Sequence, residues 1–134
     1  MKVIIDLNVL LDVIQKRLPH YDASAKALSR VLNGEVDGVL PGHAVTTIYY
    51  VVAKYADRDR ADDAVDWMVD HFDVEASGKA DFVRARSLSM KDFEDAVIAA
   101  LAERAGCDYI VTRNVSDFAG SPVSAITPLA FLSV

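Results

Sequence analysis

VIIDLNVLLD, residues 3–12, begins as an uninterrupted apolar run, reaches Asp6, and continues with apolar residues at helical spacing. A short apolar run followed by a helical pattern is typical of a strand buried on both faces of a parallel sheet. Residues 109–111 repeat the arrangement as YIV and end at Thr112. Because ligands bind outside the carboxyl ends of parallel strands, the two stretches predict a polar site at one edge of a sheet.

Short apolar segments alternate with longer helical patterns along the whole chain. The predicted strands, four to five in number, are residues 3–5, 38–40, 72–74, 109–112 and 123–126. The predicted helices cover about residues 9–16, 22–32, 44–56, 59–71, 79–86 and 91–105, with a last helical turn from Pro128. This alternation predicts a three-layer α/β/α fold with a mainly parallel sheet. No linker, repeat or low-complexity stretch interrupts it, so residues 1–134 are expected to form a single domain.

The composition limits the classes of partner. Asp and Glu outnumber Lys and Arg by 20 to 14, for a net charge of −6, which is not the balance of a protein that holds nucleic acid by phosphate neutralisation alone. A nucleic-acid substrate would therefore need bound metal to reverse the local field. We find no 18-residue apolar run and no secretion signal, and the single Cys107 has no partner for an internal disulfide. A cytoplasmic location without membrane contact is expected.

Acids gather at the beginnings of two predicted helices. Asp6 follows the first strand, where Asp is also a favoured helix cap. Asp92 and Asp95 are three residues apart and so share one face of their helix, and together with Glu94 they also suit the positive end of the helix dipole. Asp95 directly precedes the apolar run AVIAAL. An acid at the entrance of such a buried helix needs a partner.

A polar loop follows the 109–112 strand. It contains Asn114 and Asp117, which either join the acids or hydrogen-bond their own backbone as turn formers. Thr112 either donates its hydroxyl to a carboxylate or fills a strand position, and Arg113 either balances the acids, binds a phosphate or faces solvent. Asn8 either orients Asp6 or caps the helix. Acids that converge on one sheet edge repel one another unless a cation or protons intervene, so we predict a divalent-metal site.

Taken together, these segments resemble the PIN domain, the fold of VapC-type toxin ribonucleases and related metal-dependent ribonucleases. The resemblance rests on three ordered motifs and a C-terminal segment: VIIDLNVLLD (3–12), DFEDAVIAALA (92–102), IVTRNVSDF (110–118) and PLAFL (128–132). Two positions depart from the family pattern. Thr47, in the segment HAVTTIYY (43–50), stands where a Glu is usual, and Asn114 stands where many relatives have Asp. The first departure resembles a subgroup that lacks this Glu.

The resemblance implies a metal-dependent endoribonuclease that cuts single-stranded RNA, with Mg²⁺ or Mn²⁺ as cofactor. It gives Asp6 and Asp95 as primary metal ligands, with Asp117 and Asp92 holding a second ion or its waters. Asn8, Thr47, Thr112 and Asn114 would orient these groups, and Lys16, Arg17 and Arg113 are candidate phosphate contacts. The resemblance also makes plausible a homodimer, a cognate antitoxin and a role as the toxin of a toxin–antitoxin pair.

Two other functions remain open from the sequence. A degenerate, non-catalytic PIN-like binding domain is favoured by Thr47 and Asn114, because the loss of charged ligands weakens metal binding. A phosphatase of the haloacid-dehalogenase type would use Asp6 as nucleophile. That class wants a second Asp two residues later, where this chain has Asn8.

Overall fold

Strand β1 (Lys2–Ile5) lies in the middle of a five-stranded sheet in the computed structural model, which describes residues 1–134. The strand order is β3-β2-β1-β4-β5, and every neighbouring pair is parallel. The other strands are β2 (Asp37–Pro41), β3 (Asp73–Glu75), β4 (Tyr109–Val111) and β5 (Ser124–Ile126). The predicted parallel α/β fold is confirmed. The predicted strands at residues 72–74 and 123–126 are present as β3 and β5, with bounds within one residue of the prediction.

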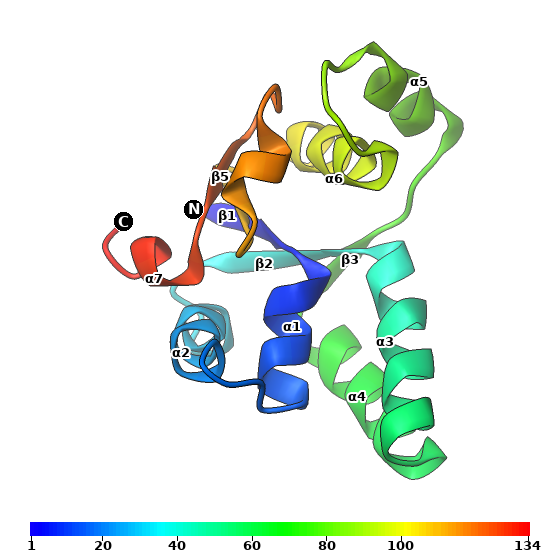
Figure 1. Cartoon of the computed structure of the whole chain (residues 1–134), viewed down its shortest axis with the longest axis vertical. Coiled ribbons are helices and arrows are strands. Elements are labelled where there is room, and N and C mark those ends of the chain that lie inside the picture. The colour runs from blue at the N-terminus through cyan, green and yellow to red at the C-terminus, as the bar shows by residue number, and fades with distance from the viewer.

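Helices cover both faces of the sheet, which makes the three predicted layers (Figure 1). One face carries α1 (Leu7–Ile14), α2 (Tyr21–Leu32), α3 (Gly42–Tyr55), α4 (Arg58–His71) and α7 (Pro128–Phe131). The other face carries α5 (Lys79–Ser87), α6 (Phe93–Arg104) and the 3₁₀ turn η1 (Val115–Phe118). No helix is long and apolar enough to cross a membrane.

Alternate residues of each central strand enter different cores. Val3 and Ile5 of β1 pack into the core beneath α1–α4, whereas Ile4 packs beneath α6. Leu40 and Val39 of β2 divide in the same way. A strand with two covered faces needs apolar side chains at every position. The continuous apolar runs of the sequence thus have a direct structural cause.

Helix boundaries differ from the predicted ones by one or two residues. The first helix ends at Ile14 rather than at residue 16, since Lys16 takes a positive φ of 50°. The third begins at Gly42 rather than 44, directly after the extended Pro41. The sixth begins at Phe93 rather than 91, because Asp92 is extended and accepts a hydrogen bond from the Asp95 amide as its cap. The last difference places Asp92 at the helix entrance.

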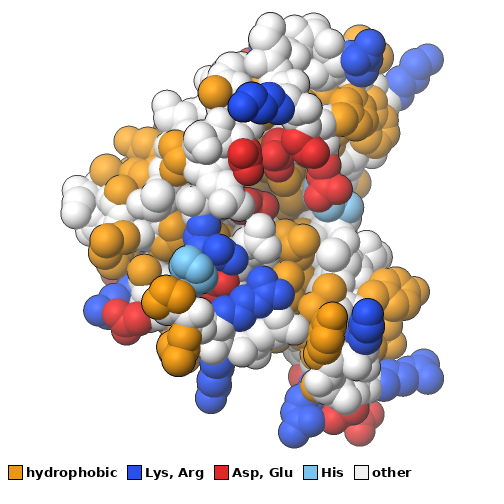
Figure 2. All heavy atoms as spheres, viewed as in Figure 1, with side chains coloured by type: hydrophobic (Ala, Val, Ile, Leu, Met, Phe, Trp, Pro, Cys, Tyr) orange, Lys and Arg blue, Asp and Glu red, His pale blue; other side chains and the backbone are white.

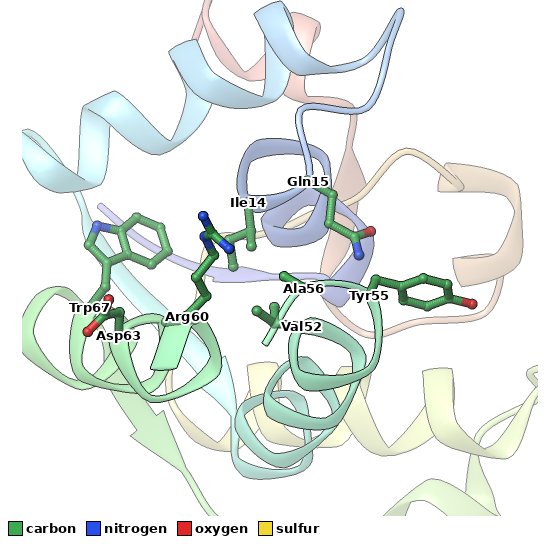
Figure 3. A pocket seen from close by; sticks show the side chains of 9 residues that line it. Ile14, Gln15, Val52, Tyr55, Ala56, Arg60, Asp63 and Trp67 are labelled. Atoms are coloured by element: carbon green, nitrogen blue, oxygen red, sulfur yellow. The ribbon is translucent and has the colours of Figure 1, made fainter. Parts of the chain in front are cut away.

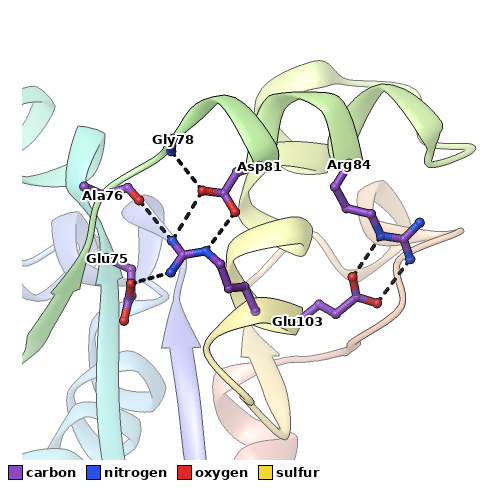
Figure 4. A network of polar contacts seen from close by, with 7 residues as sticks. Glu75, Ala76, Gly78, Asp81, Arg84 and Glu103 are labelled. Carbon is purple, nitrogen blue, oxygen red and sulfur yellow. Dashed lines mark hydrogen bonds and ion pairs between the residues drawn. The ribbon is translucent and has the colours of Figure 1, made fainter.

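A set of arginine–carboxylate contacts ties α5 to α6 and to the end of β3 (Figure 4). The Arg104 guanidinium donates to Asp81 at 2.9 Å, to Glu75 at 3.1 Å and to the Ala76 carbonyl at 3.0 Å. Asp81 is buried, and its Oδ2 also accepts a hydrogen bond from the Gly78 amide. Arg84 pairs with Glu103 on the surface. These contacts fix the orientation of α5 against α6.

Candidate active site

Asp6 and Thr112 are brought together by the pairing of β1 with β4. Ile5 is in register with Val111, so the two residues that follow them lie side by side at the carboxyl edge of the sheet. The Thr112 hydroxyl donates to Asp6 Oδ2 at 2.8 Å, and both side chains are buried. Asp6 occupies the N-cap position of α1, but its side chain does not cap the helix. The carboxylate is therefore positioned by the strand pair and faces the sheet edge.

Asp95 reaches the same edge from the first turn of α6. Its amide donates to Asp92 Oδ1 at 3.0 Å, so Asp92 is a true helix cap and has one carboxylate oxygen engaged in capping. Seven consecutive residues, Ala96–Ala102, are buried beyond Asp95. This buried run anchors the helix against the sheet and leaves its acidic first turn at the edge.

The loop after β4 supplies a third group of side chains. Asn114 precedes η1, and its amide donates to Thr112 Oγ1 at 3.1 Å. Asp117 lies within η1 and is exposed. Gly120 has a φ of +91°, and a Cβ atom there would lie 2.4 Å from the Ser89 carbonyl oxygen. Only glycine permits this close approach, which brings the η1 loop against the segment that leads to Asp92.

These side chains line one cleft of about 270 Å³, which we call the acidic cleft. Figure 2 shows a gathering of acidic side chains on this face of the molecule. The lining residues come from β1–α1, from the start of α6 and from the η1 loop: Asp6, Leu7, Asn8, Asp92, Glu94, Asp95, Asn114, Asp117 and Phe118. The structure thus brings together six of the nine predicted site residues in the lining and a seventh, Thr112, directly behind Asp6, whereas Thr47 and Arg113 lie outside it.

The acidic cleft carries more negative charge than its surroundings balance. Burial and the nearby Asp92, Asp6, Asp117 and Glu94 carboxylates raise the pKa of Asp95 to about 6. Burial also raises the pKa of Asp6, opposed in part by the Thr112 hydrogen bond. The ion pairs of the protein include none of Asp6, Asp92, Asp95 and Asp117.

A divalent cation fits this set of donors. Hard carboxylate and amide oxygens are suitable ligands for Mg²⁺ or Mn²⁺, and a cation would remove the repulsion that raises the Asp95 pKa. No three His, Cys, Asp or Glu side chains are already arranged around a common point for a metal. The exposed acids would therefore rotate toward a bound ion, with Asp6 as the one fixed carboxylate.

Comparison with known proteins identifies the fold family. A family model described as PIN domain matches residues 2–116. The chain belongs to the PIN domain family. It is also 29% identical over 120 residues to Ribonuclease VapC1 of Aquifex aeolicus (strain VF5), an alignment that covers 86% of this chain and 83% of the relative.

Solved structures share the PIN domain fold of this chain at low identity. VapBC2 from Rickettsia felis, bound to a DNA fragment from its promoter, matches with a TM-score of 0.73 at 16% identity and covers 95% of this chain and 98% of that chain. A toxin–antitoxin complex from Klebsiella pneumoniae matches with a TM-score of 0.71 at 22% identity, over 94% and 97%. At these identities the likeness shows the fold.

Thr47 does not reach the acidic cleft of this PIN domain. It is exposed on α3 and is not among the cleft residues. One turn earlier, His43 lies at the sheet edge with Nε2 3.6 Å from Glu94 Oε1. The sequence reasoning did not single out His43, and the only available signal was its place directly after the strand that ends at Pro41. In three dimensions, α3 presents His43, not Thr47, to the rim of the cleft.

Arg113 points away from the acidic cleft and pairs with Asp12, a contact that the sequence reasoning did not foresee. Its Nε lies 2.9 Å from Asp12 Oδ2, outside the angles of a hydrogen bond, and the Ser24 hydroxyl donates to the same oxygen at 2.9 Å. Asp12 is completely buried. Of the three proposed roles for Arg113, charge balance is the one the geometry supports, and the acid that it balances lies on α1. The Arg113 charge also acts on Asp6, where it opposes the burial that raises the pKa of that carboxyl.

A separate apolar groove of about 570 Å³ lies between α1, α3 and α4 of the PIN domain (Figure 3). Its nine lining residues are Ile14, Gln15, Val52, Tyr55, Ala56, Arg60, Asp63, Ala64 and Trp67. None of them belongs to the acidic cleft. We name this surface the α1–α4 groove. Aromatic and aliphatic side chains make up most of its lining, with Arg60 and Asp63 as the two charged residues.

Proposed function

We propose that this PIN domain is a metal-dependent endoribonuclease that hydrolyses single-stranded RNA and serves as the toxin of a toxin–antitoxin pair. The observation that carries the proposal is the meeting of Asp6 and Asp95 in one cleft, where neither carboxylate forms an ion pair with a Lys, Arg or His side chain. The named relative, a ribonuclease, supports the reaction class. The proposal retains one domain over residues 1–134 and a cytoplasmic location.

The chain's own groups have distinct roles in this mechanism. A bound Mg²⁺ or Mn²⁺ would polarise the scissile phosphate and lower the pKa of a water molecule. Asp6, held by the Thr112 hydroxyl, and Asp95, in the first turn of α6, would be the primary ligands. Asp117 and Asp92 would hold a second ion or its waters. Asn8 and Asn114 would orient water and phosphate through their neutral amides.

Metal-dependent stabilisation tests the proposal without relying on catalysis. Mn²⁺ or Mg²⁺ is expected to raise the unfolding temperature of the wild type, because a ligand that binds only the folded state stabilises it. Asp6→Asn and Asp95→Asn should lose this response and should cut a single-stranded RNA at least about 100-fold more slowly. Asp62→Asn, an exposed acid on α4, is the matched control. A wild type with no metal response and no cleavage would sink the proposal.

The degenerate binding-domain function is the second candidate. Two observations favour it: Thr47 lies outside the acidic cleft, and no three acids are already arranged for a metal. The same experiment separates the two candidates. RNA binding without metal response or cleavage would support the binding domain.

An antitoxin segment is the proposed occupant of the α1–α4 groove. The solved toxin–antitoxin complexes that share this fold support the existence of such a partner. Tyr55 lines the groove and is strongly exposed. The product of a short reading frame beside this gene should co-purify with the wild type, whereas Tyr55→Glu should abolish co-purification. Unchanged co-purification would move the partner to another face.

A homodimer is part of the proposal. Tyr50 on α3 and Val69 on α4 are large apolar residues exposed on neighbouring helices, whereas Ile48 and Val52 are core residues. Light scattering should give twice the chain mass, and a Tyr50→Glu, Val69→Glu double variant should reduce it to one. A monomeric wild type would contradict this part.

A further inference from the structure

Another groove, separate from the α1–α4 groove, adjoins the acidic cleft. It has a volume of about 420 Å³ and lies between the starts of α3, α5 and α6, where it is lined by Gly42, His43, Ser77, Phe82, Phe93 and Glu94, among others. Glu94 also lines the acidic cleft, so the two depressions share a wall. We call this second depression the aromatic groove. A polymer seated in the acidic cleft would have its adjoining unit beside the aromatic groove.

Two phenylalanine rings give the aromatic groove its character. Phe82 of α5 and Phe93 of α6 are stacked with ring centroids 6.3 Å apart and an interplanar angle of 27°. Both are exposed, to 43% and 49%. Large apolar rings are normally withdrawn from water, and two adjacent exposed rings beside a charged cleft mark a binding surface.

The ring pair is held in place from behind. Asp81, the residue before Phe82, accepts hydrogen bonds from Arg104 and from the Gly78 amide (Figure 4). Phe93 is the first residue of α6, directly after the Asp92 cap. Each ring therefore stands on a helix whose position is fixed by polar contacts. A prearranged platform of this kind loses little conformational freedom when a flat ligand stacks on it.

His43 adds an unsatisfied polar group to the aromatic groove. Its Nε2 is shielded from solvent and makes no hydrogen bond, and Glu94 Oε1 lies 3.6 Å away. Buried polar atoms without partners are uncommon and costly. The ring of His43 lines the aromatic groove together with the two phenyl rings. A flat ligand with hydrogen-bonding groups on its rim would cover the phenyl rings and place that rim beside His43, where a small side-chain rotation would bring Nε2 into contact.

We propose that the aromatic groove holds one base of a single-stranded RNA, next to the phosphate bound at the acidic cleft. The base stacks on Phe93, which Phe82 supports, and its edge faces His43. Stacking on aromatic side chains is a common way for proteins to hold unpaired bases. The contact itself involves no charge, which suits a chain with a net charge of −6. The inference rests on the proposed ribonuclease function and deepens it.

A second copy of the chain is the competing occupant, since exposed rings also suit an interface. The continuity of the aromatic groove with the acidic cleft through Glu94 favours the base.

The test uses short single-stranded RNAs that each carry 2-aminopurine at a different position, bound in Mn²⁺ to the full chain. Stacking should quench the fluorescence at one position beside the cleavage point. Phe93→Leu keeps an apolar side chain but removes the ring, and should weaken RNA affinity by about 5- to 150-fold and abolish that quenching. Phe93→Trp should restore both. Leu129→Ala, which shortens an exposed apolar side chain on α7 that does not line the groove, is the matched control.

The outcomes separate this inference from the proposed function. Loss of quenching in Phe93→Leu, with unchanged thermal unfolding and rescue by Phe93→Trp, supports the base-binding groove. Wild-type cleavage with unaltered affinity and quenching in Phe93→Leu overturns the groove and leaves the ribonuclease intact. A changed molecular mass in Phe93→Leu with unaltered RNA affinity makes the groove an interface between copies and also overturns it. A wild type that neither binds nor cuts RNA overturns both proposals.

Discussion

Carboxylates in the acidic cleft and in the α5–α6 contact region lie in opposite electrostatic environments, and their pKa values shift in opposite directions. Around α5 and α6, Asp81 is matched to Arg104, and the match lowers the pKa of Asp81. In the acidic cleft, Asp95 meets other acids, and its pKa rises to about 6. The first arrangement stabilises the fold and the second strains it. Natural proteins keep unfavourable charge mainly at functional sites. The raised pKa of Asp95 therefore supports the acidic cleft as the candidate site, whereas the paired Asp81 is a structural acid.

The largest expected effect on stability comes from Asp12, the most buried acid that has an arginine partner. Arg113→Met removes the cation beside Asp12, which is 0% exposed, and should lower the free energy of unfolding by about 3–5 kcal/mol because a buried charge is left uncompensated. Urea unfolding measures it. The double variant Asp12→Leu, Arg113→Met should recover most of the loss. A cost below about 1 kcal/mol for Arg113→Met would show that water already solvates Asp12.

A smaller loss is expected at the α5–α6 contacts. Arg104→Met leaves Asp81 and Glu75 without their partner, and should cost about 1–2 kcal/mol, since Arg104 itself is half exposed. Arg84→Met is the matched control, because Arg84 and Glu103 pair on the surface, and exposed pairs of this kind contribute little to stability. Equal losses for the two variants would remove the distinction between the buried acid and the exposed one.

Removing a carboxylate from the acidic cleft should raise the free energy of unfolding rather than lower it. Asp95→Asn removes a carboxylate that repels its neighbours, so in metal-free buffer near neutral pH it should stabilise the protein by about 1 kcal/mol, a value reduced for solvent screening. Added Mn²⁺ should stabilise the wild type and leave Asp95→Asn unchanged. Thermal unfolding with and without the ion measures both effects. A destabilised metal-free variant would make Asp95 a structural acid like Asp81.

Much of this contrast was accessible from the sequence. Continuous apolar runs can be buried only between two helical layers, so the parallel sheet and the convergence of Asp6, Asp95 and Asp117 followed from where the runs end. Asp95 stood out because AVIAAL follows it directly. Those local patterns extend over only a few residues, which is why they could be interpreted without a structure.

The missed contacts depend on how distant elements pack. Asp12 and Arg113 are far apart in the chain, and nothing in either local pattern pairs them. His43 reaches the rim of the cleft because α3 begins at Gly42, which places His43 in its first turn at the sheet edge. Thr47 lies one turn further along α3 and is exposed to solvent. Which side chain of α3 faces the site is set by how α3 packs on the sheet, and the local sequence does not show that packing.

The smallest expected effect is a divergence in pH dependence. Asp95 has a raised folded-state pKa of about 6, so its contribution to stability is fully present below the unfolded value of 3.8 and is lost as pH rises through about 6. Asp81 has a lowered pKa, so its contribution is present above 3.8 and is lost as pH falls through the folded value. The excess stability of metal-free Asp95→Asn over the wild type should therefore vanish between about pH 7 and pH 4.

Denaturant unfolding across this range gives the measurement, with Asp81→Asn as the comparison variant. The stability advantage of the wild type over Asp81→Asn should persist down to about pH 4 and shrink only at lower pH. If both variants differed from the wild type by constant amounts at every pH, the two carboxylates would not be held in different electrostatic environments.

The hydrogen bond from Thr112 to Asp6 spans 106 residues of sequence and joins the residue after β4 to the residue after β1. Because β1 precedes β4 in the chain, the middle strand lacks its second neighbour until β4 has been synthesised. Pairing over such a separation is slow, because the loop-closure entropy is lost before the contacts form. A chain interrupted before residue 109 has no η1 loop and no complete acidic cleft. For the proposed ribonuclease, a partly synthesised copy would therefore lack Asn114 and Asp117 of the site.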